Sequence, residues 1–267
     1  MTTRRGRPKQ TESPVSAHSD PASAGEPLRP YLREELDALS MHFSVCEIQS
    51  RMQLRRPDAL ALEYTRTMMG FLLFKPEPQR IAMVGLGGGS LAKFCHRHLP
   101  KAALVVAEIN PHVIALRGAF QVPPDDARFQ VIRIDGAHFV SQTEQRFDVL
   151  LVDAFDVQGM PPTLGAQRFY EDCADVLLPG GVLVVNLHAG HPHCPVYLGR
   201  IRAAFGANVL RVDDADGSNS VVFACRGEPL RLPAKPFHGR PMLPPDAAAQ
   251  LRGAFTRVTT ALRKVAD

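Results

Sequence analysis

A run of glycines and four acidic residues stand where their side chains could do chemistry together. Gly85, Gly87 and Gly89 directly follow the apolar run 81–84. Each acid stands at or just after the end of another apolar run, and the acids are Glu108, Asp135, Asp153 and Asp156. Closely spaced glycines let a backbone turn sharply and approach a ligand where a Cβ would clash. A carboxylate after the second strand of such a unit can accept both hydroxyls of a ribose, so this pattern predicts a nucleoside site.

The acids at the later strand ends separate two kinds of nucleoside cofactor. A dinucleotide site would explain the glycines and Glu108, but it has no general need for Asp153 or Asp156. A sulfonium cofactor with an amine substrate does need them, because carboxylates stabilise positive charge and bind ammonium groups. In this interpretation Asp135, followed by Gly136, accepts from an adenine amino group. Alternatively, Asp135 and Asp156 cap loops or helices.

Alternating apolar and helix-like segments from residue 80 onward indicate the elements that position these residues. We expect strands at 81–84, 103–107, 129–134, 147–152 and 182–187, and helices at 91–98, 110–120, 165–178 and 195–205. Continuous Val, Ile and Leu runs are typical of strands buried on both faces, so the fold is predicted to be α/β, with a doubly wound, mostly parallel, Rossmann-like sheet. Strands at 209–212 and 221–225 are joined by too few residues for a helical crossover, which predicts an antiparallel strand at the end of the sheet.

The flanking segments suggest the domain organisation. Residues 1–28 are expected to be a disordered tail, basic at first and then rich in Pro and Ser. Residues 29–78 form a small cap, with a β-hairpin in 39–52 and a helix over 57–74. Residues 79–230 form the catalytic domain. Residues 231–267 form a linker and an amphipathic helix that caps the core or meets a second copy in a homodimer.

Composition excludes several classes of function. The net charge of +4 comes partly from the first ten residues, which carry four basic groups and no acid, so nucleic-acid binding is not expected. No run reaches the length of a membrane-spanning helix, and no secretion signal follows the basic start. The five cysteines are scattered without a CxxC spacing, which favours reduced thiols in a cytoplasmic enzyme.

The segment 188–194 is the one place where the sequence suggests a metal ion. Its candidate ligands are His188, His191, His193 and Cys194. Ligands crowded into a few loop residues rarely close a tetrahedral zinc site without a distant partner. We therefore expect no metal, and interpret the segment as a polar loop over the active site.

The order of these motifs resembles the spermidine synthase-like polyamine aminopropyltransferases, which have the class I S-adenosylmethionine-dependent methyltransferase fold. The matching segments are the glycine loop, Glu-Ile-Asn-Pro at 108–111, Asp-Gly at 135–136, the Asp-x-x-Asp signature at 153–156, Arg-Phe-Tyr at 168–170 and Ile-Gln-Ser at 48–50. The resemblance implies that Glu108 holds the ribose and Asp135 the adenine. It also implies that Asp153 takes the proton of the attacking amine and that Asp156 positions that amine. Gln49 and Tyr64 would line the substrate pocket.

The reaction implied by the resemblance moves an aminopropyl group from decarboxylated S-adenosylmethionine to a small amine such as putrescine and releases methylthioadenosine. Gly88 stands where the family's loop carries an aspartate that holds the aminopropyl ammonium. Residues 213–220 also lack the family's late tyrosine. Two alternatives therefore stay open: a methyltransferase that uses intact S-adenosylmethionine, and a catalytically idle nucleoside-binding protein that works through its C-terminal helix.

Overall fold

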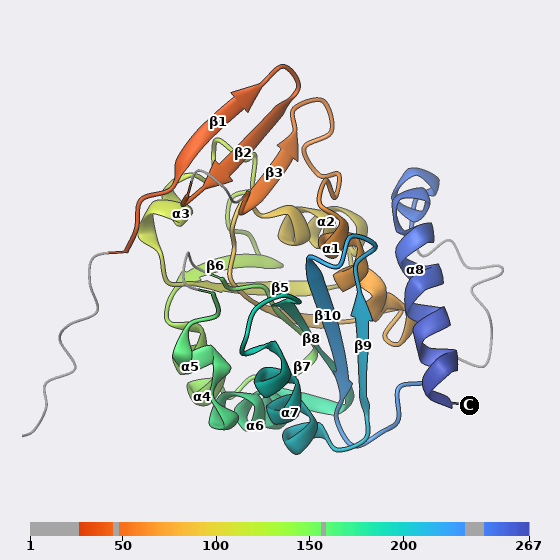
Figure 1. The fold of residues 1–267 in the computed structure, drawn as a ribbon. Coiled ribbons are helices and arrows are strands. Elements are labelled where there is room, and N and C mark those ends of the chain that lie inside the picture. Colours follow the sequence, from red (N-terminus) through yellow and green to blue (C-terminus); the bar gives the residue numbers. More distant parts are fainter. Residues whose placement is uncertain (1–26, 45–47, 156–158, 233–242, 267) are drawn as a thin grey trace, which may run out of the picture.

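The structure of the chain is a computed structural model, and it describes residues 27–44, 48–155, 159–232 and 243–266. Asp156, one of the five cysteines (Cys46) and all but the last two residues of the expected tail at 1–28 lie outside the described residues. The described residues form a seven-stranded sheet flanked by helices and a separate three-stranded sheet near the N-terminus (Figure 1). No helix in these ranges is long and apolar enough to cross a membrane.

The large sheet has the strand order β6-β5-β4-β7-β8-β10-β9. The bounds of its strands are Arg80–Val84 for β4, Ala103–Glu108 for β5, Phe129–Arg133 for β6, Phe147–Val152 for β7, Leu177–His188 for β8, Val209–Asp213 for β9 and Asn219–Cys225 for β10. The pairings β6-β5-β4-β7-β8 are parallel, whereas β10 pairs antiparallel with both β8 and β9. The predicted doubly wound sheet and its antiparallel strand are confirmed.

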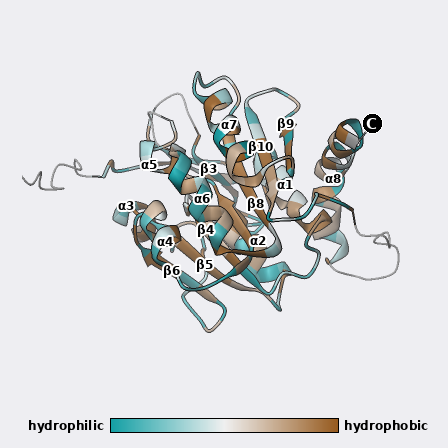
Figure 2. Ribbon diagram, turned by 90° about the horizontal axis from the view of Figure 1, so that it is seen from below, coloured by the Kyte–Doolittle hydropathy of each residue, from teal (hydrophilic) through white to brown (hydrophobic). Residues whose placement is uncertain are grey.

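Both faces of the sheet are covered, which is why its strands carry uninterrupted apolar runs. Ile81 and Met83 pack into one hydrophobic cluster, and Ala82 and Val84 into another on the opposite face. The first face is covered by α1 (Glu63–Met68), the 3₁₀ helix η1 (Met69–Leu73), α2 (Ser90–His98), α3 (Pro111–Ala115) and α8 (Pro245–Ala266). The second is covered by α4 (Gly136–Gln142), α5 (Pro162–Gly165), α6 (Gln167–Val176) and α7 (Cys194–Phe205). Figure 2 shows hydrophobic residues concentrated on the sheet strands between these helices.

The predicted helices differ from the observed ones mainly in length. Residues 57–62 are not helical, because the backbone N–H of Leu60 donates to Gln250 of α8 at 3.0 Å instead of joining a helix. The helix expected over 110–120 ends at Ala115, after which the chain turns and buries Phe120. The helix expected over 165–178 is divided, since Ala166 is extended between α5 and α6, and β8 already begins at Leu177.

The N-terminal sheet contains the predicted hairpin and one further strand. The hairpin consists of β2 (Ala38–His42) and β3 (Ser50–Gln53), which are antiparallel. The additional strand, β1 (Tyr31–Glu35), pairs with β2 along its length. All five of its residues are exposed, so it carries no alternating apolar pattern that would have predicted it.

Candidate active site

The candidate site lies at the edge where the parallel strands end. Gly85 follows β4, Glu108 ends β5, and Asp153 follows β7. The chain comes so close here that a Cβ on Gly85 would lie 2.1 Å from the carbonyl oxygen of Asp153, and Gly85 has a φ of +92°. In open α/β sheets, ligands bind outside the carboxyl ends of the strands. The predicted glycine loop and the predicted catalytic aspartate are therefore neighbours.

Glu108 connects the second strand to the glycine loop. Its side chain is buried, with one carboxylate oxygen accepting from the N–H of Leu86 and the other from the N–H of Asn110, both at 2.8 Å. Burial raises the pKa of Glu108, and the backbone hydrogen bonds act against this rise. The N–H groups of Ile109 and Gly87 also interact with this carboxylate, so four backbone groups hold it at the glycine loop.

Asp135 caps a helix that the sequence did not predict. Its Oδ1 accepts from the N–H of His138 at 2.8 Å, which fixes the first turn of α4. Gly136 packs so tightly that a Cβ there would lie 2.3 Å from Cγ1 of Val84. The capping alternative is therefore present in the structure. The cap uses Oδ1 of Asp135. The second carboxylate oxygen is an acceptor, as binding of an adenine amino group requires.

Asp153 is the centre of a small hydrogen-bond network. Asn186 of β8 donates from Nδ2 to Oδ1 of Asp153 at 3.0 Å, and the hydroxyl of Tyr64 on α1 also hydrogen-bonds this carboxyl group. Burial raises the pKa of Asp153 and outweighs the lowering effect of the two hydrogen bonds. The pKa of Tyr64 is raised well above its ordinary value, first by burial and then by the charge of Asp153. A carboxylate with a raised pKa accepts a proton more readily, as a general base requires.

Asn186 was missed by the sequence analysis. The available signal was an amide side chain inside the otherwise apolar strand predicted at 182–187. Parallel pairing of β7 with β8 places Val152 opposite Val185, so Asp153 and Asn186 follow side by side. The sheet register therefore produces their contact.

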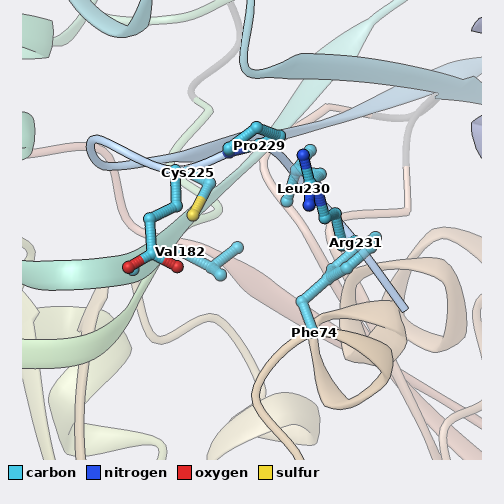
Figure 3. A pocket seen from close by; sticks show the side chains of 8 residues that line it. Phe74, Val182, Cys225, Pro229, Leu230 and Arg231 are labelled. Carbon is cyan, nitrogen blue, oxygen red and sulfur yellow. The ribbon is translucent and has the colours of Figure 1, made fainter. Parts of the chain in front are cut away.

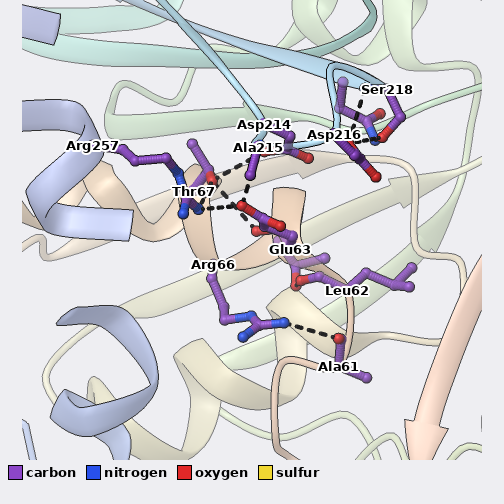
Figure 4. Close-up of polar contacts among 12 residues, drawn as sticks. Ala61, Leu62, Glu63, Arg66, Thr67, Asp214, Ala215, Asp216, Ser218 and Arg257 are labelled. Atoms are coloured by element: carbon purple, nitrogen blue, oxygen red, sulfur yellow. Dashed lines mark hydrogen bonds and ion pairs between the residues drawn. The ribbon is translucent and has the colours of Figure 1, made fainter. Parts of the chain in front are cut away.

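Helix α1, which carries Tyr64, is bound to the rest of the protein by a polar network (Figure 4). Arg257 of α8 forms an ion pair with Glu63 at 2.9 Å and donates to the hydroxyl of Thr67 at 3.1 Å. Thr67 in turn lies 3.3 Å from Oδ1 of Asp214 in the turn between β9 and β10. Burial, followed by the charge of Glu63, raises the pKa of Asp214 to about 6. These contacts tie Tyr64 to α8 and to the β9–β10 hairpin.

The small N-terminal sheet contacts the glycine loop through Ser50. The hydroxyl of Ser50 accepts from the N–H of Gly88 at 2.8 Å. Gln49, the predicted substrate-pocket residue, directly precedes it, and its backbone N–H donates to Met41 at 2.9 Å. The structure thus brings the strand that follows Gln49 to the loop.

Gly88 is surrounded by side chains. A Cβ at this position would lie 2.7 Å from Cδ1 of Phe120 and 3.0 Å from Cβ of Ser50. Phe120 therefore fills the space that a side chain at position 88 would need. The sequence placed Phe120 at the end of an expected helix and gave no sign that it contacts the site.

The segment 188–194 forms aromatic contacts. His188 stacks on Phe155 with ring centroids 4.3 Å apart, and His191 and His193 pack against Tyr197. In the described ranges no three His, Cys, Asp or Glu side chains are grouped so that they could hold a metal ion. A polar loop near Asp153 is consistent with the stacking of His188 on Phe155, two residues after Asp153.

A cavity of about 360 Å³ lies elsewhere, between Phe74, the start of β8 and the end of β10 (Figure 3). It is lined by Gly180 and Val182, whereas the site residue Asn186 lies in the other half of β8. The cavity therefore lies at the opposite ends of the strands from Glu108 and Asp153, and it does not belong to the candidate site.

Comparison with known proteins identifies the family. A family model described as the spermine/spermidine synthase domain matches residues 61–196, slightly more than half of the chain. The chain belongs to the spermine/spermidine synthase family. Among its curated relatives, the polyamine aminopropyltransferase of Chromobacterium violaceum is 38% identical over 217 residues, covering 78% of this chain and 83% of the relative. That of Neisseria meningitidis is 35% identical over 211 residues, covering 78% and 80%.

Solved structures of spermidine synthases and a methyltransferase share the fold of this family member. A probable spermidine synthase from Corynebacterium glutamicum aligns with a TM-score of 0.68 at 18% identity, covering 89% of this chain and 90% of that one. Human methyltransferase-like protein 13 in complex with SAH aligns with a TM-score of 0.58 at 22% identity, covering 76% and 93%. The predicted resemblance, the fold and the assignment as an aminopropyltransferase are confirmed. The roles of the individual site residues stay predictions.

Proposed function

We propose that this enzyme transfers the aminopropyl group of decarboxylated S-adenosylmethionine to a small diamine such as putrescine and releases methylthioadenosine. The observation that carries the proposal is the contact between the glycine loop at Gly85 and Asp153, whose carboxyl group is held by Asn186 and Tyr64. This contact supports the proposal because the reaction requires two parts close together. One part is a loop that binds the nucleoside of the sulfonium donor, and the other is a base that accepts a proton from the attacking amine.

Asp153 acts as the proton acceptor of the reaction. The amine nitrogen, in its neutral form, bonds to the methylene carbon while the carbon–sulfur bond breaks and its electron pair stays on sulfur. The nitrogen thereby becomes positively charged, and Asp153 takes one of its protons. An aliphatic amine has a pKa of about 10, so binding must favour its neutral form. Holding the two reactants in line supplies much of the remaining rate enhancement.

The adenosyl part of the donor fits the residues that are present. Glu108 is a buried carboxylate that would hold the ribose, and the positive φ of Gly85, Gly87 and Gly89 forms the tight loop that brings backbone N–H groups to it. Asp135 would accept from the adenine amino group. Asp156 would position the acceptor amine together with Gln49 and Tyr64. No residue role in this proposal requires a metal ion.

In the family, an aspartate in the glycine loop holds the aminopropyl end of the donor. This chain has Gly88 at that position. This observation favours a second candidate, methyl transfer from intact S-adenosylmethionine, which needs no acid there. Calorimetry separates the two, since an aminopropyltransferase binds the decarboxylated donor more tightly than the intact one. The reverse order would favour the methyltransferase.

The direct experiment is a turnover assay. Purified enzyme supplied with decarboxylated S-adenosylmethionine and putrescine is expected to release methylthioadenosine, detected by chromatography, and Asp153→Asn is expected to abolish the release. A binding measurement with methylthioadenosine controls for the folding of the variant. Failure to release methylthioadenosine with putrescine or any other diamine would overturn the proposal.

Three broader expectations also stay proposals. The division into segments 1–28, 29–78, 79–230 and 231–267 is best tested by limited proteolysis. A cytoplasmic location agrees with the free thiols of the four described cysteines, Cys95, Cys173, Cys194 and Cys225. A homodimer is tested by light scattering.

A further inference from the structure

The amide group of Asn186 is satisfied on only one side. Its Nδ2 donates to Asp153 at 3.0 Å, but its Oδ1 is buried and has no hydrogen-bond partner in the described part of the chain. The residue is 2% exposed. A buried carbonyl oxygen without a partner costs about 1–3 kcal/mol, so native proteins rarely leave one unless a ligand or water supplies the missing donor.

The position of this oxygen follows from the contact with Asp153. The nitrogen must face the carboxylate, because two acceptor oxygens would repel each other. The nitrogen and oxygen of a planar amide are about 2.2 Å apart. Oδ1 of Asn186 therefore lies at most about 5 Å from Oδ1 of Asp153. A single nitrogen placed between them can reach both at ordinary hydrogen-bond lengths of about 2.7–3.2 Å.

The neighbours of Asn186 in the adjacent strands are apolar residues and an acceptor, so none of them supplies the missing donor. In the next strand Asn186 is opposite Val221, which is in turn opposite Val212. On the other side is Asp153, an acceptor, with Tyr64 hydrogen-bonded to it. Asp153 and Tyr64 both keep part of their surface exposed, so a ligand can approach this network from their side.

We propose that Oδ1 of Asn186 binds the attacking nitrogen of the acceptor amine. This inference rests on the proposed function. A neutral primary amine has two N–H groups and one lone pair. One N–H donates to Asp153, which later takes that proton, and the other donates to Asn186. With both N–H groups hydrogen-bonded, the lone pair of the nitrogen remains free and points to the carbon that is attacked.

A neutral amide is well suited to this position. A second carboxylate beside Asp153 would share a proton with it, since two adjacent carboxylates do not both ionise easily. An apolar residue would leave one N–H of the amine without an acceptor. Asn186 provides the acceptor and, through Nδ2, also holds Asp153 in place.

The test must separate binding of the amine from support of Asp153. Asn186→Leu removes both polar atoms at nearly constant volume, and it is made in the wild type and in an Asp153→Asn background. Calorimetry then measures the affinity of each variant for putrescine in the presence of saturating methylthioadenosine. We expect Asn186→Leu to weaken putrescine about tenfold in both backgrounds, as the loss of one hydrogen bond implies, with methylthioadenosine affinity unchanged.

Asn208→Leu is the matched control, because Asn208 lies just before β9, at the opposite edge of the sheet, and should leave putrescine affinity unchanged. If Asn186→Leu weakens putrescine only when Asp153 is present, Asn186 acts through Asp153 and the inference is wrong. Should Asn186→Leu not fold, Asn186→Asp is made in the Asp153→Asn background, where it keeps an acceptor oxygen without placing two carboxylates side by side. This double variant is expected to bind putrescine at least as tightly as Asp153→Asn alone, and a loss of tenfold or more would overturn the inference.

Failure of the inference can be distinguished from failure of the proposed function. If the wild-type enzyme transfers no aminopropyl group to any diamine, the proposed function is wrong. If it does so, and Asn186→Leu binds putrescine normally, only the role of Asn186 is wrong.

Discussion

The ring of Phe120 occupies the space that a side chain at Gly88 would need, with Cδ1 2.7 Å from the position of a Cβ. Phe120 is 1% exposed and is placed by the turn that ends α3 early. The glycine at position 88 is thus required by packing in this chain. The aspartate that the family's loop carries could enter only if Phe120 moved, so other groups must hold the end of the aminopropyl chain.

The first prediction tests this packing. Gly88→Ala should destabilise the protein by about 1–3 kcal/mol, because overpacking forces neighbouring side chains to shift. Urea denaturation measures the change. Gly118→Ala is the matched control, since a Cβ there would meet nothing within 4 Å, and its stability should stay close to that of wild type. Equal stability of the two variants would show that Phe120 yields readily and that the loop tolerates a side chain.

The second prediction concerns Glu108. Glu108→Gln keeps the shape of the side chain, but it removes the charge that strengthens hydrogen bonds to a ribose and replaces one of two acceptor oxygens with a donor. Methylthioadenosine should bind about 1.5–3 kcal/mol more weakly, measured by calorimetry. Glu144→Gln, an exposed substitution after α4, should have no effect. Unchanged affinity of Glu108→Gln would mean that the ribose is held elsewhere.

The inner strands of the sheet could be predicted from the sequence because they are buried on both faces and so appear as continuous apolar runs, as in β4, β7 and β10. The helix ends could not, since they depend on contacts distant in sequence. The non-helical course of residues 57–62 depends on Gln250 of α8, and the end of α3 on the burial of Phe120. Helix α4 was missed because it is a short helix that Asp135 caps, and Asp135 was interpreted first as a ligand.

The same limit applies to the site. The residues at the strand ends, Glu108, Asp135 and Asp153, could be placed because topology alone brings strand ends to one edge. Asn186 could not be placed in the site, because its contact with Asp153 depends on the register between β7 and β8. Phe120 could not be placed either, because its position depends on a turn that folds back on the glycine loop.

The third prediction concerns the pH dependence of catalysis. Asp153 must be deprotonated to act as a base, so the rate should fall as pH drops through its pKa. The hydrogen bond from Tyr64 lowers that pKa. Tyr64→Phe removes it, so the pKa of Asp153 should rise and the acid limb of the kcat profile should move to higher pH. Methylthioadenosine release followed across pH measures the shift.

Tyr31→Phe controls for the loss of a tyrosine hydroxyl away from the site, since Tyr31 donates to the carbonyl of Ser44 in the N-terminal region. Its profile should match the wild type. An acid limb that stays in place or moves to lower pH in Tyr64→Phe would show that Tyr64 does not stabilise the charged form of Asp153.

The fourth prediction concerns the stability of the network around α1. The pKa of Asp214 is raised to about 6 in the folded protein, so the folded state holds its proton more tightly than the unfolded state does. The stability from this carboxyl group is therefore fully present below its ordinary pKa of about 4 and is lost as pH rises through about 6. Asp214→Asn, which resembles the protonated form, should remove this loss and be about 1–2 kcal/mol more stable than wild type at pH 8.

Asp216 provides the contrast, because its two hydrogen bonds with Ser218 lower its pKa. A lowered pKa gives stability that is present at neutral pH and lost as pH falls, so Asp216→Asn should be less stable than wild type at pH 8. Thermal melting of both variants between pH 4 and pH 8 measures the two opposite signs. If Asp214→Asn is instead less stable than wild type at pH 8, the attraction between Asp214 and Arg257 outweighs the cost of burying the charge, and the ionised form of Asp214 is the one that holds α1 and Tyr64 in place.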